Sequence, residues 1–231
     1  LSPEVRFVDP DTRKYFDTAC RCYNIAVFCG GVSSEREVSL VSGKAVADAL
    51  QDAGHAVERI DVVAPSMPDC STDTEVVFPA LHGTFGEDGG MQQLLEKAGM
   101  PYVGSDAEAS ALIMDKVRTK SRLQEQDIRT PDFCTVSDEA LSPERVDIRA
   151  PLVVKPACEG STMGLTRLDE VTAESWCQAL QKALSMGEEA IVEEAVDGTE
   201  MTVGVLDGVA LPAMEIVPPD GRIFDYDAKY V

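Results

Sequence analysis

Basic residues are scarce in this 231-residue chain. Lysine and arginine together number 20 against 41 acidic residues, so the formal net charge at pH 7 is −21. Nucleic acids and anionic lipid surfaces are themselves negatively charged and would be repelled. The composition argues against a partner of either kind. Because lysines are few, each lysine beside a glycine-rich turn becomes a stronger candidate for binding a phosphate.

Long apolar runs and a paired cysteine framework are also missing. No apolar run approaches the ~20 residues of a membrane span, and the first residues lack the basic and apolar regions of a signal peptide. The seven cysteines are odd in number and scattered, as is typical of reduced thiols. Cys20 and Cys22 form C-x-C without a second ligand pair nearby, which favours an incidental spacing over a metal site. We therefore expect a soluble, cytoplasmic protein.

Strands and helices alternate after an irregular beginning. Residues 1–23 are polar, and we interpret them as an extension or linker. The pattern then predicts, in order, a strand from Asn24, a helix over 38–53, strands over 56–63 and 75–81, a helix over 91–98, a short strand over 101–103 and a helix over 107–126. This alternation is typical of a parallel sheet covered by helices.

A second region begins at the Thr130-Pro131 turn. Predicted strands over 133–136, 152–155 and 190–193 with a helix over 173–185 favour a smaller α+β unit, and strands over 200–206 and 209–217 begin a third region. The sequence thus predicts an extension over 1–23, an N-terminal domain over 24–110, a central domain over 111–195 and the start of a C-terminal domain over 196–231.

Two polar turns follow strands of the first domain and are expected to share one crevice, because ligands of open α/β sheets bind outside the carboxyl ends of the strands. Glu35 follows the first strand and is suited to holding a ligand ammonium, although an acid that complements the helix dipole would look the same. His82 ends the third strand, with Glu87 in the next turn. A histidine there is either part of a substrate site or a hydrogen-bonded structural residue.

The stretch VVKPACEGSTMG over residues 153–164 has the features of a phosphate cradle. A short strand leads into Lys155 and then into a loop with two glycines and two hydroxyls. Backbone N–H groups, hydroxyls and a lysine can together surround an anion with donors and positive charge. By itself the loop is equally consistent with an ordinary strand and turn, since it is neither the Walker pattern nor the dinucleotide fingerprint.

Six sequence blocks, taken together and in order, resemble the motifs of D-alanine–D-alanine ligases in the ATP-grasp superfamily. They are GGVSSEREVSL, ALHGTFGEDGGMQ, PYVGSDAEASALIMDK, VVKPACEGSTMG, VEEAVDGTEMTVGV and FDYDAKY, and the resemblance extends over residues 25–231. It implies the α/β ATP-grasp fold: an N-terminal parallel α/β domain, an α+β central lid domain and a truncated C-terminal lobe. It also implies a homodimer formed through the N-terminal domain.

The resemblance implies which residues bind ATP. Lys116 and Lys155 look like the two lysines that bind the phosphates. A mobile flap covers the phosphates and holds them through its backbone N–H groups and Ser161. The remaining nucleotide-binding positions that it implies are the flap residues Glu159, Gly160 and Gly164, the stretch Glu193, Glu194, Ala195 and Val196, which reads adenine through backbone groups, and the ribose-binding Glu200.

The resemblance also implies a substrate site. Glu35 looks like the acid that holds the ammonium of the first D-alanine, with His82 and Glu87 nearby. Ser161 and Tyr230 resemble the serine and the ω-loop tyrosine that join Glu35 in a hydrogen-bonded triad closing the site, and Lys229 lies in the same loop. In the family, ATP phosphorylates the carboxylate of one D-alanine, and the amino group of another attacks the acyl phosphate.

The chain departs from the family pattern in two places. Ala195 stands where relatives often have an aromatic residue, and Ala157-Cys158 where they often have a serine and a basic residue, so adenine packing is expected to be looser and one phosphate contact to be missing. Cys158 is interpreted as an inert side chain rather than a reactive thiol. The carboxylates and the asparagine that bind magnesium, and the arginine that serves the oxyanion, are expected beyond residue 231, in a longer enzyme.

Three readings of the function stay open at this point. The resemblance favours ligation of two D-alanine molecules for peptidoglycan precursor synthesis, with ATP and Mg²⁺. A related D-alanyl-D-lactate or D-alanyl-D-serine ligase is an alternative, which the Asp227-Ala228-Lys229-Tyr230 loop disfavours for the lactate ester. The third reading is that the protein is not an enzyme but a noncatalytic module that binds ATP.

Overall fold

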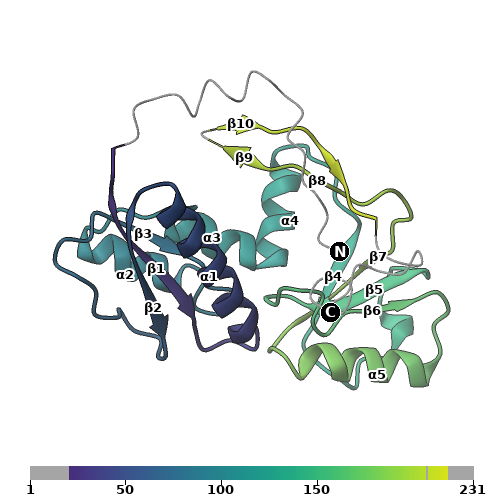
Figure 1. Ribbon diagram of the computed structural model, residues 1–231. Helices are drawn as coiled ribbons and strands as arrows, with labels where there is room; N and C mark the ends of the chain where they lie inside the picture. Colours follow the sequence, from purple (N-terminus) through teal and green to yellow (C-terminus); the bar gives the residue numbers. More distant parts are fainter. Residues whose placement is uncertain (1–20, 207, 218–231) are drawn as a thin grey trace.

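The first part of the chain forms a parallel sheet (Figure 1). The computed structural model describes residues 21–206 and 208–217. Strands β1 (Asn24–Gly30), β2 (Ala56–Val62) and β3 (Val76–Pro79) pair in the order β2-β1-β3, and both pairings are parallel. Every residue of β1 after Asn24 is buried, because it is the central strand and is covered on both faces. The predicted parallel α/β layer is therefore confirmed.

Helices cover this sheet. Helix α1 (Arg36–Asp52) packs against β1, and α2 (Gly90–Ala98) contributes Met91 and Leu95 to the core around Phe28. A Cβ added at Gly43 of α1 would lie 2.3 Å from the Cβ of Cys29, so only glycine allows the helix to approach this closely. The predicted strand over 101–103 is reduced to a single bridge between Tyr102 and Val77.

The helix expected over 107–126 is two helices. Helix α3 (Ala107–Met114) ends before Asp115, whose backbone is extended, and α4 (Lys116–Glu125) begins after it. The carboxylate of Asp115 accepts hydrogen bonds of 3.0 Å from the backbone N–H groups of Val117 and Arg118, so it caps α4. The break places Lys116 in the first turn of α4, where its side chain and its backbone N–H are both free of α3.

The second part of the chain is a four-stranded antiparallel sheet with one covering helix. Strands β4 (Phe133–Val136), β5 (Leu152–Pro156), β6 (Thr166–Leu168) and β7 (Ala190–Glu194) pair in the order β4-β7-β5-β6. A short 3₁₀ helix (Pro143–Arg145) and helix α5 (Ala173–Leu184) complete the unit. Trp176 and Leu180 of α5 pack on Val154 and Val192. Strand β6 was not predicted.

Four very short strands follow the second sheet, where two long strands were expected. Strand β8 (Met201–Thr202) pairs with β11 (Met214–Glu215), and β9 (Val205–Leu206) pairs with β10 (Val209–Ala210), both antiparallel. Figure 1 shows them as a yellow arm that extends away from α5. The domain boundaries given above stay a prediction. Among the described residues, no helix combines the length and apolar character needed to cross a bilayer.

Candidate functional site

Glu35 and Ser161 meet where the two parts of the chain face each other. Glu35 lies directly before α1 and is buried, yet its side chain makes no capping bond to that helix. The hydroxyl of Ser161 donates a hydrogen bond to Oε1 of Glu35, across 126 residues of sequence. The predicted flap thus contacts the predicted ammonium-binding acid. Lys229 and Tyr230, the other predicted residues of this group, lie outside the described residues.

The flap has an unusual backbone. Ser161, Thr162 and Gly164 have φ angles of 48°, 62° and 70°, in the left-handed region that β-branched residues such as threonine rarely adopt. Such angles persist only where the surroundings impose them, and they concentrate at ligand-binding segments. A Cβ at Gly164 would lie 2.7 Å from Cγ of Pro156, so the end of the flap is pressed against the end of β5. Gly160 has open space apart from Oε2 of Glu35 at 3.8 Å.

His82 and Glu87 hold the turn beside Glu35. The hydroxyl of Ser33 donates to the carbonyl of His82 at 2.7 Å, and Nε2 of His82 lies 3.1 Å from the Ser42 hydroxyl. Glu87 accepts a 2.7 Å hydrogen bond from the backbone N–H of Gly83. These are local structural contacts, and they place the turn within reach of Glu35: a Cβ at Gly83 would be 2.9 Å from its Oε2.

The two predicted phosphate lysines lie close together. Nζ of Lys116 donates to the carbonyls of Glu159 and, at 3.4 Å, Ala157. Burial lowers the pKa of Lys116, and the positive charge of Lys155 lowers it further. Burial raises the pKa of the neighbouring Cys158 thiol, which agrees with an unreactive side chain. Two ammonium groups thus lie beneath the flap, with the carboxylates of Glu159 and Glu193 near them.

Glu193 lies between two lysines. Its Oε1 accepts from Lys155 and its Oε2 accepts from Lys120 at 2.8 Å. Burial by itself would raise the pKa of Glu193, but the hydrogen bonds and charges of Lys120 and Lys155 outweigh it, so the pKa is lowered and the carboxylate stays ionised. Lys120 was missed from the sequence. The available signal was its spacing, since Lys120 lies one turn after Lys116 on the same helix.

A cavity of about 790 Å³ opens beside these charges, between the second sheet and the β8–β11 arm. Its lining residues are Pro131, Val153, Lys155, Leu165, Arg167, Glu193, Glu194, Val196, Asp197, Gly198, Thr199, Glu200, Glu215, Ile216 and Val217. Five of the predicted nucleotide-binding positions are therefore together in one cavity: Lys155, Glu193, Glu194, Val196 and Glu200. Ala195 is buried and its side chain is not part of the lining.

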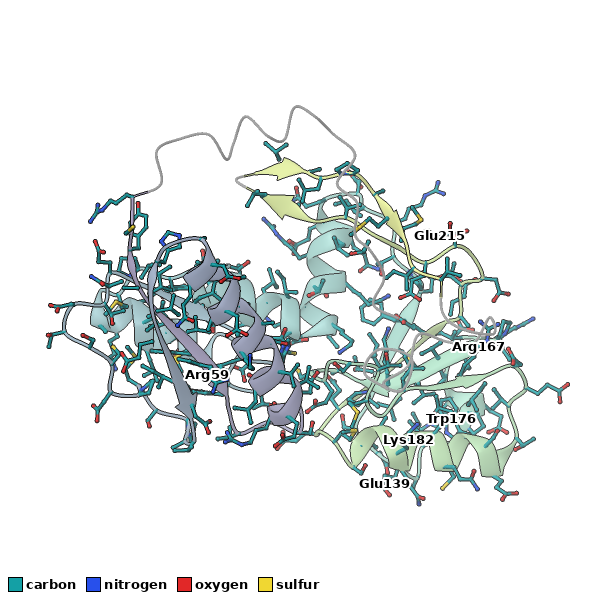
Figure 2. The ribbon with its side chains drawn as sticks, in the orientation of Figure 1. Arg59, Glu139, Arg167, Trp176, Lys182 and Glu215 are labelled. Atoms are coloured by element: carbon teal, nitrogen blue, oxygen red, sulfur yellow. The ribbon has the colours of Figure 1, made fainter. Side chains whose placement is uncertain are left out.

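Arg167 is a second cavity residue that the sequence did not single out. It donates to Asp169 at 2.8 Å and lies 2.9 Å from Asp197, which joins β6 to the loop after β7. Figure 2 shows Arg167 on the sheet and Glu215 on the arm above it. Within the described ranges, no three histidine, cysteine, aspartate or glutamate side chains are grouped as metal ligands would be.

Comparison with known proteins accounts for this arrangement. The family profile described as "D-ala D-ala ligase C-terminus" matches residues 114–231, and "D-ala D-ala ligase N-terminus" matches residues 64–105. D-alanine–D-alanine ligase of Coprothermobacter proteolyticus is 43% identical over 223 residues, covering 90% of this chain and 70% of that protein. The enzyme of Syntrophotalea carbinolica is 44% identical over 208 residues, covering 89% of this chain and 67% of the relative.

Solved structures of D-alanine–D-alanine ligases resemble this chain as well. D-alanine–D-alanine ligase of Bacillus anthracis in complex with ATP superposes with a TM-score of 0.76 at 30% identity, covering 88% of this chain and 68% of the other. D-alanyl-alanine synthetase A of Vibrio cholerae gives 0.73 at 27% identity, covering 92% and 72%. The predicted ATP-grasp fold is thus confirmed, with the C-terminal lobe present in part. The chain belongs to the D-alanine–D-alanine ligase family.

Proposed function

We propose that this protein joins two molecules of D-alanine to D-alanyl-D-alanine while ATP is converted to ADP and phosphate. One observation carries the proposal: Ser161 of the flap contacts the buried Glu35, while Lys155 at the base of the same flap lines a cavity large enough for a nucleotide. In this proposal the ammonium-binding acid, the flap and the phosphate lysines serve one reaction site.

The cavity has the mixture of groups that ATP needs. Val153, Leu165 and Ile216 offer apolar surface to a purine ring, and Glu200 offers a carboxylate to ribose hydroxyls. Lys155 faces the phosphate end, with Lys116 beside it under the flap. Each lysine attracts the negative charge of the transferring phosphoryl group, and such fixed charge in a partly buried place is the main means of catalysing phosphoryl transfer.

The reaction follows from these positions in two steps. Glu35 holds the ammonium of the first D-alanine, whose carboxylate oxygen takes the γ-phosphoryl group of ATP, and ADP leaves. The amino group of the second D-alanine then attacks the acyl carbon, and the C–O bond to phosphate breaks as the amine loses a proton. The flap over Glu35 excludes water, which would otherwise hydrolyse the acyl phosphate.

Magnesium, the homodimer and the cytoplasmic location belong to the same proposal. Magnesium would spread the charge of the ATP phosphates. In the part of the chain that the structure describes, no three suitable side chains are grouped to hold the ion. Light scattering of the purified protein tests the homodimer.

Phosphate release by the purified full-length protein tests the activity. We expect release with ATP, magnesium and D-alanine alone. A protein that released phosphate with D-lactate but not with D-alanine alone would refute dipeptide synthesis, and one that bound ATP without forming ADP would be a noncatalytic module.

A matched pair of variants tests the first D-alanine site. Glu35→Ala should raise the D-alanine requirement by about tenfold or more, as expected when a charge-assisted hydrogen bond is lost. Glu37→Ala, an exposed acid two residues away, should behave as the wild type. Unchanged D-alanine kinetics in Glu35→Ala would show that the acid was assigned wrongly.

A further inference from the structure

Three charged side chains, of which Lys120 and Glu193 are buried, are linked at and behind the inner wall of the cavity. Glu193 accepts hydrogen bonds from Lys155 through one oxygen and from Lys120 through the other. The side chains of Lys120 and Glu193 are 8% and 10% exposed. Glu193 and Lys155 line the cavity, whereas Lys120 is not one of its lining residues. Lys120 therefore acts on the contents of the cavity only through Glu193.

Lys120 is held firmly from three elements. It extends from α4, donates at 2.6 Å to the hydroxyl of Thr130 in the turn before β4, and lies 5.0 Å from the centre of the Phe133 ring on β4. An ammonium that faces an aromatic ring and donates to two oxygens has little freedom to move elsewhere. One oxygen of Glu193 is thus paired with an ammonium that lies outside the cavity.

The count of charges explains why two lysines face one carboxylate. With Lys120 present, the three groups sum to one positive charge. Without it they sum to zero, and a phosphate could draw Lys155 away only by leaving the buried Glu193 carboxylate unpaired. An unpaired buried charge is strongly unfavourable. With Lys120 in place, Glu193 stays paired whether or not Lys155 turns toward a phosphate.

We propose that Lys120 is a positioning residue for ATP: by holding Glu193, it allows Lys155 to leave that carboxylate and bind a phosphate. This rests on the proposed placement of ATP in the cavity beside Lys155. Lys120 touches no part of the nucleotide in this arrangement. Its effect is confined to the free energy that Lys155 must give up on binding.

ATP binding by Lys120→Met, measured by titration calorimetry on the full-length protein, tests the inference. We expect the dissociation constant for ATP to rise about tenfold or more, which corresponds to the loss of one interaction of an ionised group. The KM for D-alanine should change less than twofold. Arg122→Met is the matched control, because it removes an exposed cation from the same helix, and it should bind ATP as the wild type does.

A second substitution separates positioning from structure. In Lys120→Met/Glu193→Gln there is no buried carboxylate for Lys155 to leave, so the double variant should bind ATP at least threefold more tightly than Lys120→Met. A merely structural lysine would not give that recovery. Should Lys120→Met fail to fold, Thr130→Val, which removes only the hydroxyl that holds the ammonium, should weaken ATP binding about threefold without changing the KM for D-alanine.

The two proposals fail differently. Calorimetry measures ATP binding alone, so a wild type that bound ATP without forming dipeptide would overturn the proposed activity and leave the Lys120 comparison intact. A wild type that formed dipeptide, with Lys120→Met and Arg122→Met binding ATP equally well, would overturn the inference about Lys120. Equal losses of affinity for ATP and D-alanine would also overturn it.

Discussion

Substituting Gly164 with alanine tests how tightly the end of the flap is fixed to the sheet beneath it. The backbone of Gly164 is left-handed, with φ at 70°. An added Cβ would lie 2.7 Å and 2.9 Å from Cγ and Cδ of Pro156 and 3.0 Å from Sδ of Met186. Met186 has a flexible side chain and can move aside. The Pro156 ring is rigid, and its backbone is held in β5 by pairing with Ala190 of β7, so it cannot.

Two unfavourable terms add at this position. The left-handed backbone costs an alanine about 1–2 kcal/mol, and inserting a methyl group into a filled space costs about 1–3 kcal/mol. The expected loss is about 2–5 kcal/mol, against the roughly 5–15 kcal/mol by which a typical domain is stable. The variant should therefore unfold at a clearly lower urea concentration, with little change in the slope of the transition.

Two other glycines separate the terms. Gly99 has φ of 66° and nothing within 4 Å of its added Cβ, so Gly99→Ala should show the backbone term alone. Gly187 has neither a positive φ nor a close neighbour, so Gly187→Ala should change stability least. Urea unfolding of the three variants should rank them in that order, with Gly164→Ala the least stable. If Gly164→Ala lost no more stability than Gly99→Ala, the contact with Pro156 would be absent and the flap looser than described.

Three further outcomes can be checked. The lowered pKa of Glu193 implies a stabilising contribution that is present above its ordinary pKa of 4.5 and is lost as pH falls through the lower pKa of the folded state. The unfolding free energy of Glu193→Gln should therefore fall less steeply in acid than that of the wild type. Equal slopes would contradict the buried ion pairs. Asp115→Ala should destabilise the protein by about 1 kcal/mol through the lost helix cap, measured by urea unfolding, whereas Asp138→Ala, outside any helix cap, should cost less. Because the pKa of Lys116 is lowered from 10.5, affinity for ATP should fall as pH rises through that lower value, and Lys116→Arg should remove this step from a calorimetric pH profile.

The larger elements follow directly from the sequence, and the errors have local causes. The run IAVFCG after Asn24 predicts a buried central strand because it is apolar without interruption, and it forms one. The break at Asp115 was not predicted, because a helical pattern of apolar residues continues through it while the aspartate caps a new helix. Strand β6 has only three residues, which is too short for any alternation to be recognised.

The candidate site was predictable where residues are neighbours in sequence, as in the flap from Glu159 to Gly164. The resemblance also implied one tertiary contact, between Ser161 and Glu35, whereas the contacts of Lys120 were not predicted. Lys120 and Glu193 are 73 residues apart. The spacing places Lys120 on the same helix face as Lys116, but it does not indicate that this lysine reaches Glu193 of β7. Glu193 was expected to bind adenine through its backbone. The ion pairs of its side chain could be recognised only from the structure, which shows that Lys120 and Lys155 both reach it.

The contacts of Lys116 decide where the flap can bend. Its backbone N–H donates to the carbonyl of Ala157 at 3.0 Å, and its ammonium donates to the carbonyl of Glu159. The first residues after β5 are thereby fastened to the start of α4 and move with it. A flap that opened would then have to pivot beyond Glu159, within the left-handed segment that ends at Gly164. A phosphate that engaged the Lys116 ammonium would compete with the Glu159 carbonyl, so arrival of the nucleotide would also release the hinge.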